Sequence, residues 1–316
     1  GTFTAGTGTV EYNGSNGQNV AILPYYNLQI DKAEGNAEIS SSITISNDLI
    51  VKSGELNVNN DLTVEGDVII NDEGTLVANG GYSYYVKGDW TNTGTFLPGS
   101  STIILNGTDS QTISSSIFNQ LVVDKITGTT YLTGDISTNG DFTLENGIVD
   151  CLTYNIARTT DGGTLTLKAG TYIKIGGSNN VYRHYTTYNI SPSSTVEFYG
   201  NVAQSIPSRN YGNLILSNGG SNAKTAIGSF SVAGDFTINE GAQYNADNYT
   251  LDLYGNFANN GTFNAQTGLI IFNGTNKTIS GTTTFFDTEF TGSYSVSENS
   301  NITYLGQISI ISGASV

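Results

Sequence analysis

Residues 101–107 read Ser101-Thr102-Ile103-Ile104-Leu105-Asn106-Gly107. The same pattern of residue types occurs at 8–14 and at 194–200, so the interval is 93 residues from 8 to 101 and again from 101 to 194. A fourth copy, at 268–274, follows 74 residues after the third. Self-similarity at a fixed period is typical of architectures in which one structural unit stacks on the next.

A shorter period lies inside the long one. Asp48, Asp67 and Asp89 each precede a short apolar run that ends near a glycine, with spacings of 19 (48 to 67) and 22 (67 to 89). An Asp side chain can bond nearby backbone and start a turn, and glycine supplies the positive φ that a sharp corner needs. One such coil cannot bury its apolar face alone, so neighbouring coils must stack on it.

These two periods predict an all-β fold, a right-handed parallel β-solenoid with coils of about 19–22 residues nested in the 93-residue repeat. Gly is 39 of 316 residues and Pro only 4, a balance that favours many tight corners over flexible linkers. We expect a single continuous solenoid over 1–316, with repeat blocks of about 1–93, 94–186, 187–260 and 261–316 (partial).

Residues at matching positions of the blocks are expected to face the core in equivalent strands. The aromatic members of the set are expected to fill the same interior corner, each burial worth about 2 to 3 kcal/mol. The predicted core set is Val10, Leu28, Trp90, Ile103, Leu121, Phe142, Val196, Leu214, Phe236 and Phe257.

The charge balance is acidic, with 27 Asp and Glu against 11 Lys and Arg and a net charge of −16. Nucleic-acid binding requires clustered Lys and Arg, and the lysines here are scattered, so we expect no nucleic-acid partner. No apolar run reaches the ~18 residues needed for a membrane span, so no membrane insertion is expected. One cysteine and abundant Asn, Thr, Ser, Gly and Tyr favour an extracellular or cell-surface location.

The recurring aspartates allow two interpretations. They are expected to stack near one corner as turn caps, because the coil itself recurs. A ladder of Ca²⁺ sites is the alternative, although the Gly-Gly-Xaa-Gly-Xaa-Asp pattern of calcium-binding repeats is absent. We therefore predict no cofactor, with calcium as the one candidate.

Catalytic motifs are sparse. His184 is the only histidine, so a metal site built on paired histidines is impossible and a Ser-His-Asp triad has a single candidate base. Two carboxylates from adjacent coils could still meet in a glycosidase-like arrangement. The sequence therefore predicts no enzyme, with a polysaccharide lyase or glycosidase as the competing hypothesis.

One segment departs from the repeat, between Gly170 and Ser194. Aromatic rings beside polar side chains can form a platform for sugar rings, and surface glycans are the ligand this composition suggests. Packing of the same tyrosines against the solenoid is the competing interpretation. The candidate glycan-contact residues are Tyr172, Tyr182, Arg183, His184, Tyr185 and Tyr188.

The string Gly88-Asp89-Trp90-Thr91-Asn92-Thr93-Gly94-Thr95-Phe96, followed by the 101–107 pattern, resembles a known repeat. It is similar to the repeats of very large secreted surface proteins of Bacteroidota, which are often exported by the type IX system. Residues 255–263 with 272–274 give a second match. The resemblance implies cell-surface fibres and adhesins, and its motif residues are structural, so it implies no active site.

Gly1-Thr2-Phe3 matches Gly94-Thr95-Phe96 in the middle of the repeat, and the last residues are again strand-like. Uncovered strand edges invite pairing with another chain. We therefore expect either continuation in a longer repeat protein or end-to-end self-association, both of which produce a filament. The predicted function is a non-enzymatic structural or adhesive surface protein, and the alternative is an extracellular protein that binds or degrades polysaccharide.

Overall fold

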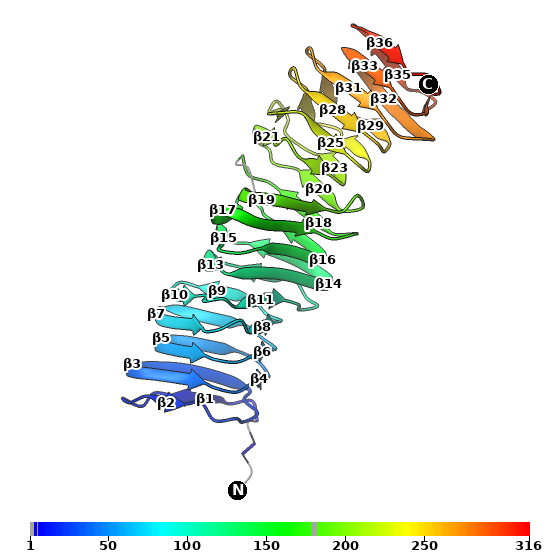
Figure 1. Ribbon diagram of the computed structural model, residues 1–316. Coiled ribbons are helices and arrows are strands. Elements are labelled where there is room, and N and C mark those ends of the chain that lie inside the picture. Colours follow the sequence, from blue (N-terminus) through cyan, green and yellow to red (C-terminus); the bar gives the residue numbers. More distant parts are fainter. Residues whose placement is uncertain (1–2, 5, 179–181) are drawn as a thin grey trace. The chain divides into compact units, whose positions relative to one another are not determined.

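The computed structural model describes residues 3–4, 6–178 and 182–316. Its described part is all-β, a parallel β-solenoid of about 15 turns in total (Figure 1). The chain forms two compact units, which are described separately: unit 1 comprises 1–150, 154–166 and 182–188, and unit 2 comprises 151–153, 167–181 and 189–316. Gly1 and Thr2, two residues of the predicted match to 94–96, lie outside the described residues.

Unit 1 is built from short strands and from longer strands that bend around a corner. Its strands are β1 (Thr9–Tyr12), β2 (Gln18–Asn19), β3 (Asn27–Ile39), β4 (Ile43–Ile45), β5 (Leu49–Val58), β6 (Leu62–Val64), β7 (Val68–Ala78), β8 (Ser83–Val86), β9 (Trp90–Asn92), β10 (Thr95–Leu97), β11 (Thr102–Leu105), β12 (Gln111–Ile113), β13 (Ser116–Phe118), β14 (Gln120–Leu132), β15 (Ile136–Thr138) and β16 (Phe142–Asp150), with most of β17 (Ile156–Leu167) and β19 (Arg183–Ile190).

Unit 2 has shorter strands and a regular three-sided coil. Its strands are β18 (Tyr172–Ile175), β20 (Thr195–Phe198), β21 (Gln204–Ile206), β22 (Asn210–Tyr211), β23 (Asn213–Leu216), β24 (Lys224–Ala226), β25 (Phe230–Val232), β26 (Phe236–Ile238), β27 (Gln243–Asn245), β28 (Thr250–Leu253), β29 (Phe257–Asn259), β30 (Thr262–Asn264), β31 (Leu269–Phe272), β32 (Lys277–Phe285), β33 (Asp287–Phe290), β34 (Tyr294–Val296), β35 (Asn301–Tyr304) and β36 (Ile308–Ile310).

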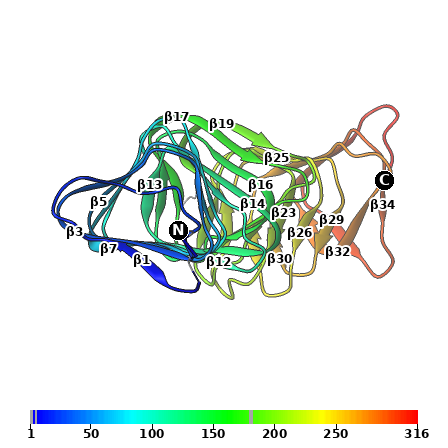
Figure 2. The ribbon, with the colours of Figure 1, turned by 90° about the horizontal axis from the view of Figure 1, so that it is seen from below.

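Successive coils pair in parallel, residue against residue. In unit 1 the bent strands β3, β5 and β7 follow the same path, as Figure 2 shows from the N-terminal end. In unit 2 each coil contributes one strand to each of three faces, for example β23, β24 and β25 and then β26, β27 and β28. Alternate side chains of each strand enter the core, because successive residues of a strand point to opposite faces.

The repeated aspartates lie one above the other at a corner, as expected, but their carboxylates bond the backbone of the next coil and not that of their own turn. The Asp48 carboxylate accepts the Asp67 backbone N–H at 2.9 Å, and the Asp67 carboxylate accepts the Asp89 N–H at 2.7 Å. Asn side chains form the same bond between coils elsewhere, since the Asn213 amide oxygen accepts the Asp235 N–H. In these coils a side-chain acceptor therefore fixes the corner of the next coil.

The 93-residue period does not return to the same face of unit 1, and this corrects the expectation that Leu28 and Leu121 occupy equivalent strands. From Leu28 to Ile113 the chain makes four coils in 85 residues. The remaining eight residues of the 93-residue period bring Leu121 to another face. One column of paired residues is Val10, Leu28, Leu49, Val68, Trp90, Ile113 and Leu132. A second is Ile43, Leu62, Tyr84, Ile103, Leu121 and Phe142.

The same correction applies to the aromatic residues of unit 1. Trp90 and Phe142 belong to different columns, so they do not fill one shared corner. Trp90 instead packs edge-on against Phe96 and Phe118, with ring centroids 4.8 and 5.3 Å apart. Val10, in the first coil, is only half-buried, whereas the other core residues predicted in unit 1 are buried.

In unit 2 the predicted core residues form one column. Val196 pairs with Leu214, Leu214 with Phe236, and Phe236 with Phe257. The fourth copy of the motif lies on a different face, because its Ile270 pairs with Leu251 in β28. The sequence copies thus share their local strand-and-corner geometry, while the face on which they lie varies.

Candidate functional site

The tyrosine-rich segment 182–188 is part of unit 1, and two of its rings are buried there. Tyr182 is 2% exposed and Tyr185 is 4% exposed, so neither ring presents a face to a sugar. The Tyr185 hydroxyl lies 2.8 Å from the Thr138 hydroxyl, and burial raises the pKa of Tyr185. The expectation that these two rings form a glycan platform is therefore corrected in favour of packing.

The other four residues of the predicted patch differ in their contacts and exposure. The Tyr188 hydroxyl donates to the Tyr182 carbonyl oxygen at 2.9 Å, while Arg183 is exposed. His184 Nδ1 lies 2.7 Å from Asp161 Oδ1, and both side chains are exposed, so solvent screens the pair. Tyr172 belongs to unit 2, where its hydroxyl donates to Glu197 Oε2 at 2.7 Å.

The acidic ladder of unit 1 is the place to test the calcium hypothesis. Burial raises the pKa of Asp67, and the charges of Asp48 and Asp89 raise it further. Each carboxylate lies in its own coil and accepts the backbone N–H of the following coil. Within 3–4, 6–178 and 182–316, no three His, Cys, Asp or Glu side chains gather as ligands for one ion.

A polar cluster that the sequence analysis missed lies inside the corner after β11. The Gln111 Oε1 accepts the Gly107 N–H at 3.1 Å, and its Nε2 donates to carbonyl oxygens of the preceding coil, Val86 and Gly88. From the following coil, the buried Lys125 Nζ donates to the carbonyl oxygens of Gly107 and Asp109, both at 2.7 Å, and to Gln111 Oε1 at 2.6 Å. Three coils are thus joined through one ammonium group and one amide.

A related lysine contact occurs in two of the other repeat blocks. In the first, Lys32 donates to the Gly14 carbonyl oxygen and to Gln18 Oε1. In the third, Lys224 reaches the carbonyl oxygen of Gly200, although it comes from a different position in its coil. Burial lowers the pKa of both Lys125 and Lys224 to about 8. The signal was present in the sequence as the three glutamines Gln18, Gln111 and Gln204, each followed by an isolated lysine.

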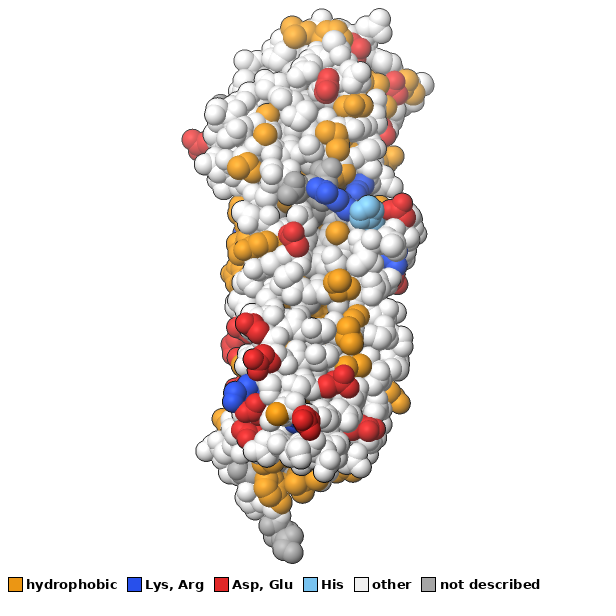
Figure 3. All heavy atoms as spheres, turned by 90° about the vertical axis from the view of Figure 1, so that its left-hand side faces the viewer, with side chains coloured by type: hydrophobic (Ala, Val, Ile, Leu, Met, Phe, Trp, Pro, Cys, Tyr) orange, Lys and Arg blue, Asp and Glu red, His pale blue; other side chains and the backbone are white. Residues whose placement is uncertain are grey.

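The described part of the chain has open troughs on its surface, and three of them are possible ligand sites. In unit 2, a trough of about 440 Å³ crosses β22, β25 and β28 and is lined by Ser208, Arg209, Asn210, Ser229, Phe230, Ser231, Asp252 and Tyr254. Two troughs of about 520 and 400 Å³ lie in unit 1 and are lined mainly by charged and polar groups, including Asp31 and Glu73. Figure 3 shows acidic side chains grouped over the N-terminal coils on the face in view.

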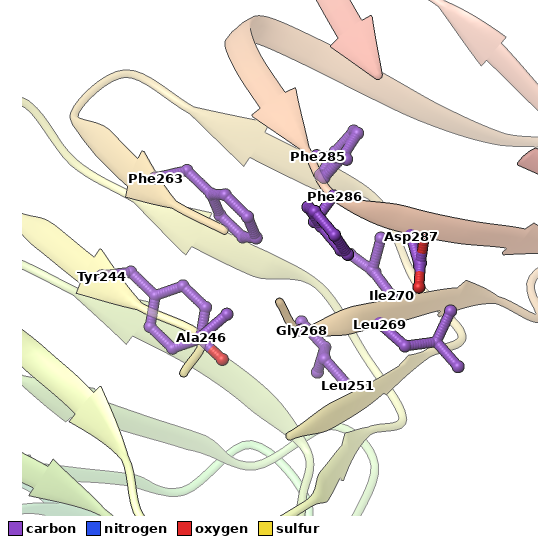
Figure 4. A pocket seen from close by; sticks show the side chains of 10 residues that line it. All are labelled: Tyr244, Ala246, Leu251, Phe263, Gly268, Leu269, Ile270, Phe285, Phe286 and Asp287. Atoms are coloured by element: carbon purple, nitrogen blue, oxygen red, sulfur yellow. The ribbon is translucent and has the colours of Figure 1, made fainter. Parts of the chain in front are cut away.

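A small gap of about 10 Å³ lies in unit 2, lined mostly by apolar side chains and also by Asp287. In Figure 4 the rings of Tyr244 and Phe263 lie on one side of it and those of Phe285 and Phe286 on the other. This volume is at the lower limit for a single water molecule. The gap is therefore an imperfection of core packing and not a ligand site.

Comparison of the chain with protein-family models, with curated proteins and with solved structures found no match in any of the three. In the described ranges of the chain, no helix is both long and apolar enough to cross a membrane.

Proposed function

We propose that the protein is a non-enzymatic structural or adhesive protein of the cell surface, which forms or belongs to a fibre. The observation that carries the proposal is the coil-to-coil linkage inside each unit. Corner side chains accept N–H groups of the next coil, and buried ammonium groups join consecutive coils through backbone carbonyls. Such linkage favours a stiff, protease-resistant scaffold, which is the property a surface fibre requires.

The extracellular location is part of the same proposal. It is supported by the sequence composition and by the resemblance of the 88–107 region to secreted surface repeats. The fibre would arise from a longer chain of the same repeats or from head-to-tail contact between copies. Negative-stain microscopy of the native material, together with its mass, tests this: particles of 33.4 kDa with no fibres and no longer precursor would contradict it.

Proteolysis tests the scaffold role. Trypsin cleaves after Lys and Arg, so the native protein should resist cleavage at the buried Lys32, Lys125 and Lys224. It should also resist cleavage at Lys52 and Lys87, whose side chains are exposed but whose backbone belongs to the coils, while the urea-unfolded protein serves as the cleavable control. Rapid cleavage at the three buried lysines under native conditions would contradict a stiff scaffold.

The competing enzyme hypothesis has its own assay. Purified protein is incubated with neutral and acidic polysaccharides, and reducing ends or unsaturated products are measured. We expect none above the buffer control. Turnover that disappears on His184→Ala, or on substitution of a single Asp, would replace the structural proposal by a lyase or glycosidase.

A further inference from the structure

We infer that the unit 2 trough across β22, β25 and β28 is a binding site for a neutral, hydroxyl-rich glycan chain. The inference deepens the adhesive part of the proposed function by naming the ligand class. It rests on that function only for its biological meaning, because the trough is defined by its own lining residues.

The floor of the trough is a row of polar side chains, one from each of three consecutive coils. Asn210 pairs with Ser231 and Ser231 with Asp252 in the parallel ladder, so the row advances by about 4.8 Å per coil. The Ser231 hydroxyl donates to Asn210 Oδ1 at 2.8 Å, which orients the Asn210 amide. The Asp252 carboxylate is half-exposed and offers acceptor oxygens to ligand hydroxyls.

Tyr254 supplies the flat apolar surface that sugar recognition needs. Its side chain lines the trough and is 48% exposed, whereas Tyr182 and Tyr185 of the sequence-predicted patch are buried. The volume of about 440 Å³ lies within the range of small-ligand sites. A pyranose ring lying on Tyr254 would place its hydroxyls over the row of polar groups.

The chemistry of the trough disfavours other ligands. Arg209 is the only cation among its lining residues and Asp252 offsets its charge, so a polyanion finds no basic surface on a chain with a net charge of −16. The backbone of Ser231 is engaged in the ladder on both sides, so a peptide cannot add to a free strand edge there. The open and polar floor offers little to an apolar molecule.

Calorimetric titration of the intact chain tests the inference, with cellohexaose, laminarihexaose and mannohexaose as probes and trigalacturonate as the anionic comparison. We expect saturable, millimolar binding of at least one neutral probe and weaker binding of trigalacturonate. Tyr254→Ala should weaken binding by about fivefold, while Tyr254→Phe keeps the stacking ring and most of the affinity.

Tyr82→Ala is the matched control, because Tyr82 is also exposed but lies in unit 1. It should bind like the unmodified chain, and thermal melting should show that all three variants remain folded. No saturation with any neutral probe, equal affinity after Tyr254→Ala, or tighter binding of trigalacturonate would each overturn the inference. A chain that binds no glycan but resists trypsin would overturn this inference and leave the scaffold proposal standing.

Discussion

At the scale of single residues, the corner ladder depends on the acceptor oxygen and not on the charge of its aspartates. Asn27, Asn213 and Asn256 accept the backbone N–H of the next coil just as Asp48 and Asp67 do. The raised pKa of Asp67 has burial as its main cause, which means that the ionised form is disfavoured at this position. A carboxylate is thus tolerated here for its geometry.

This reasoning predicts opposite effects for two substitutions of Asp67. Asp67→Asn keeps the acceptor for the Asp89 N–H and removes repulsion from Asp48 and Asp89, so the free energy of unfolding at pH 7 should stay equal or increase. Asp67→Ala leaves that N–H without its partner and should cost about 1 to 2 kcal/mol. Urea unfolding of the three proteins measures both values.

The pH dependence provides the control for the Asp67 pair. A carboxyl group with a raised folded pKa is destabilising when ionised and stops being so once it is protonated, so any advantage of Asn should shrink as the pH falls towards 4. If Asn were as damaging as Ala and calcium restored stability only to the Asp form, the ladder would be a cation site after all.

At the scale of elements, the glycines of the bent strands mark where one coil lies against the next. Gly281 in β32 has φ +90°, and a Cβ there would lie 1.8 Å from the Asn259 carbonyl oxygen of the preceding coil. Gly241 has a similar φ of +78° but no atom within 4 Å of its would-be Cβ. Both positions have a positive φ, but only Gly281 lies against the backbone of the preceding coil.

Alanine at these two positions therefore separates the two costs. Gly241→Ala should destabilise by about 1 kcal/mol, the cost of a left-handed conformation for a residue with a side chain. Gly281→Ala should cost well over ~3 kcal/mol, because the coils must move apart as well. Denaturant midpoints measure the difference, and equal losses would show that the stacking of these coils is looser than described.

At the scale of the whole molecule, buried lysines and tyrosines together set the pH of greatest stability. Lys125 and Lys224 have pKa values lowered to about 8 by burial, against ~10.4 in an unfolded chain. Between these values the unfolded chain binds more protons, so stability should rise with pH. Burial raises the pKa of Tyr244, and raises that of Tyr294 to about 12. The stability that depends on neutral tyrosines is therefore present below pH ~10 and lost above it.

We therefore expect the melting temperature to increase from pH 8 towards a maximum near pH ~10 and to fall steeply at higher pH. Lys125→Met should make the melting temperature rise less steeply between pH 8 and ~10, because it removes one of the two lysines whose pKa is lowered by burial. Lys87→Met is the control, since Lys87 lies on the surface beside Glu65 and its loss leaves the cluster intact. A maximum at neutral pH, or an unchanged slope in Lys125→Met, would contradict this account.

The repeat made the coil itself predictable. The aspartate spacing, the apolar runs and the glycines are local features, and each acts within a few residues through turn geometry and side-chain alternation. They were enough to predict a parallel β-solenoid and, except for the half-buried Val10, the apolar core residues, whereas the aspartates bond the next coil and not their own turn. The trough could not be predicted in this way, because it requires side chains from different coils to meet. The lysine clusters require the same, and the sequence showed only the recurring glutamines and lysines, not their contact.

The sequence alone thus determined the coil, its corners and which side chains turn inward. The tertiary structure decided the face on which each copy lies, since a surplus of eight residues over four coils separates Leu121 from the column of Leu28. It also decided that Tyr182 and Tyr185 are buried while Tyr254 is exposed. The physical reason is the same in each case. Strand and turn preferences are local, whereas the face on which a residue lies, its burial and its neighbours depend on the summed lengths of all the coils that precede it.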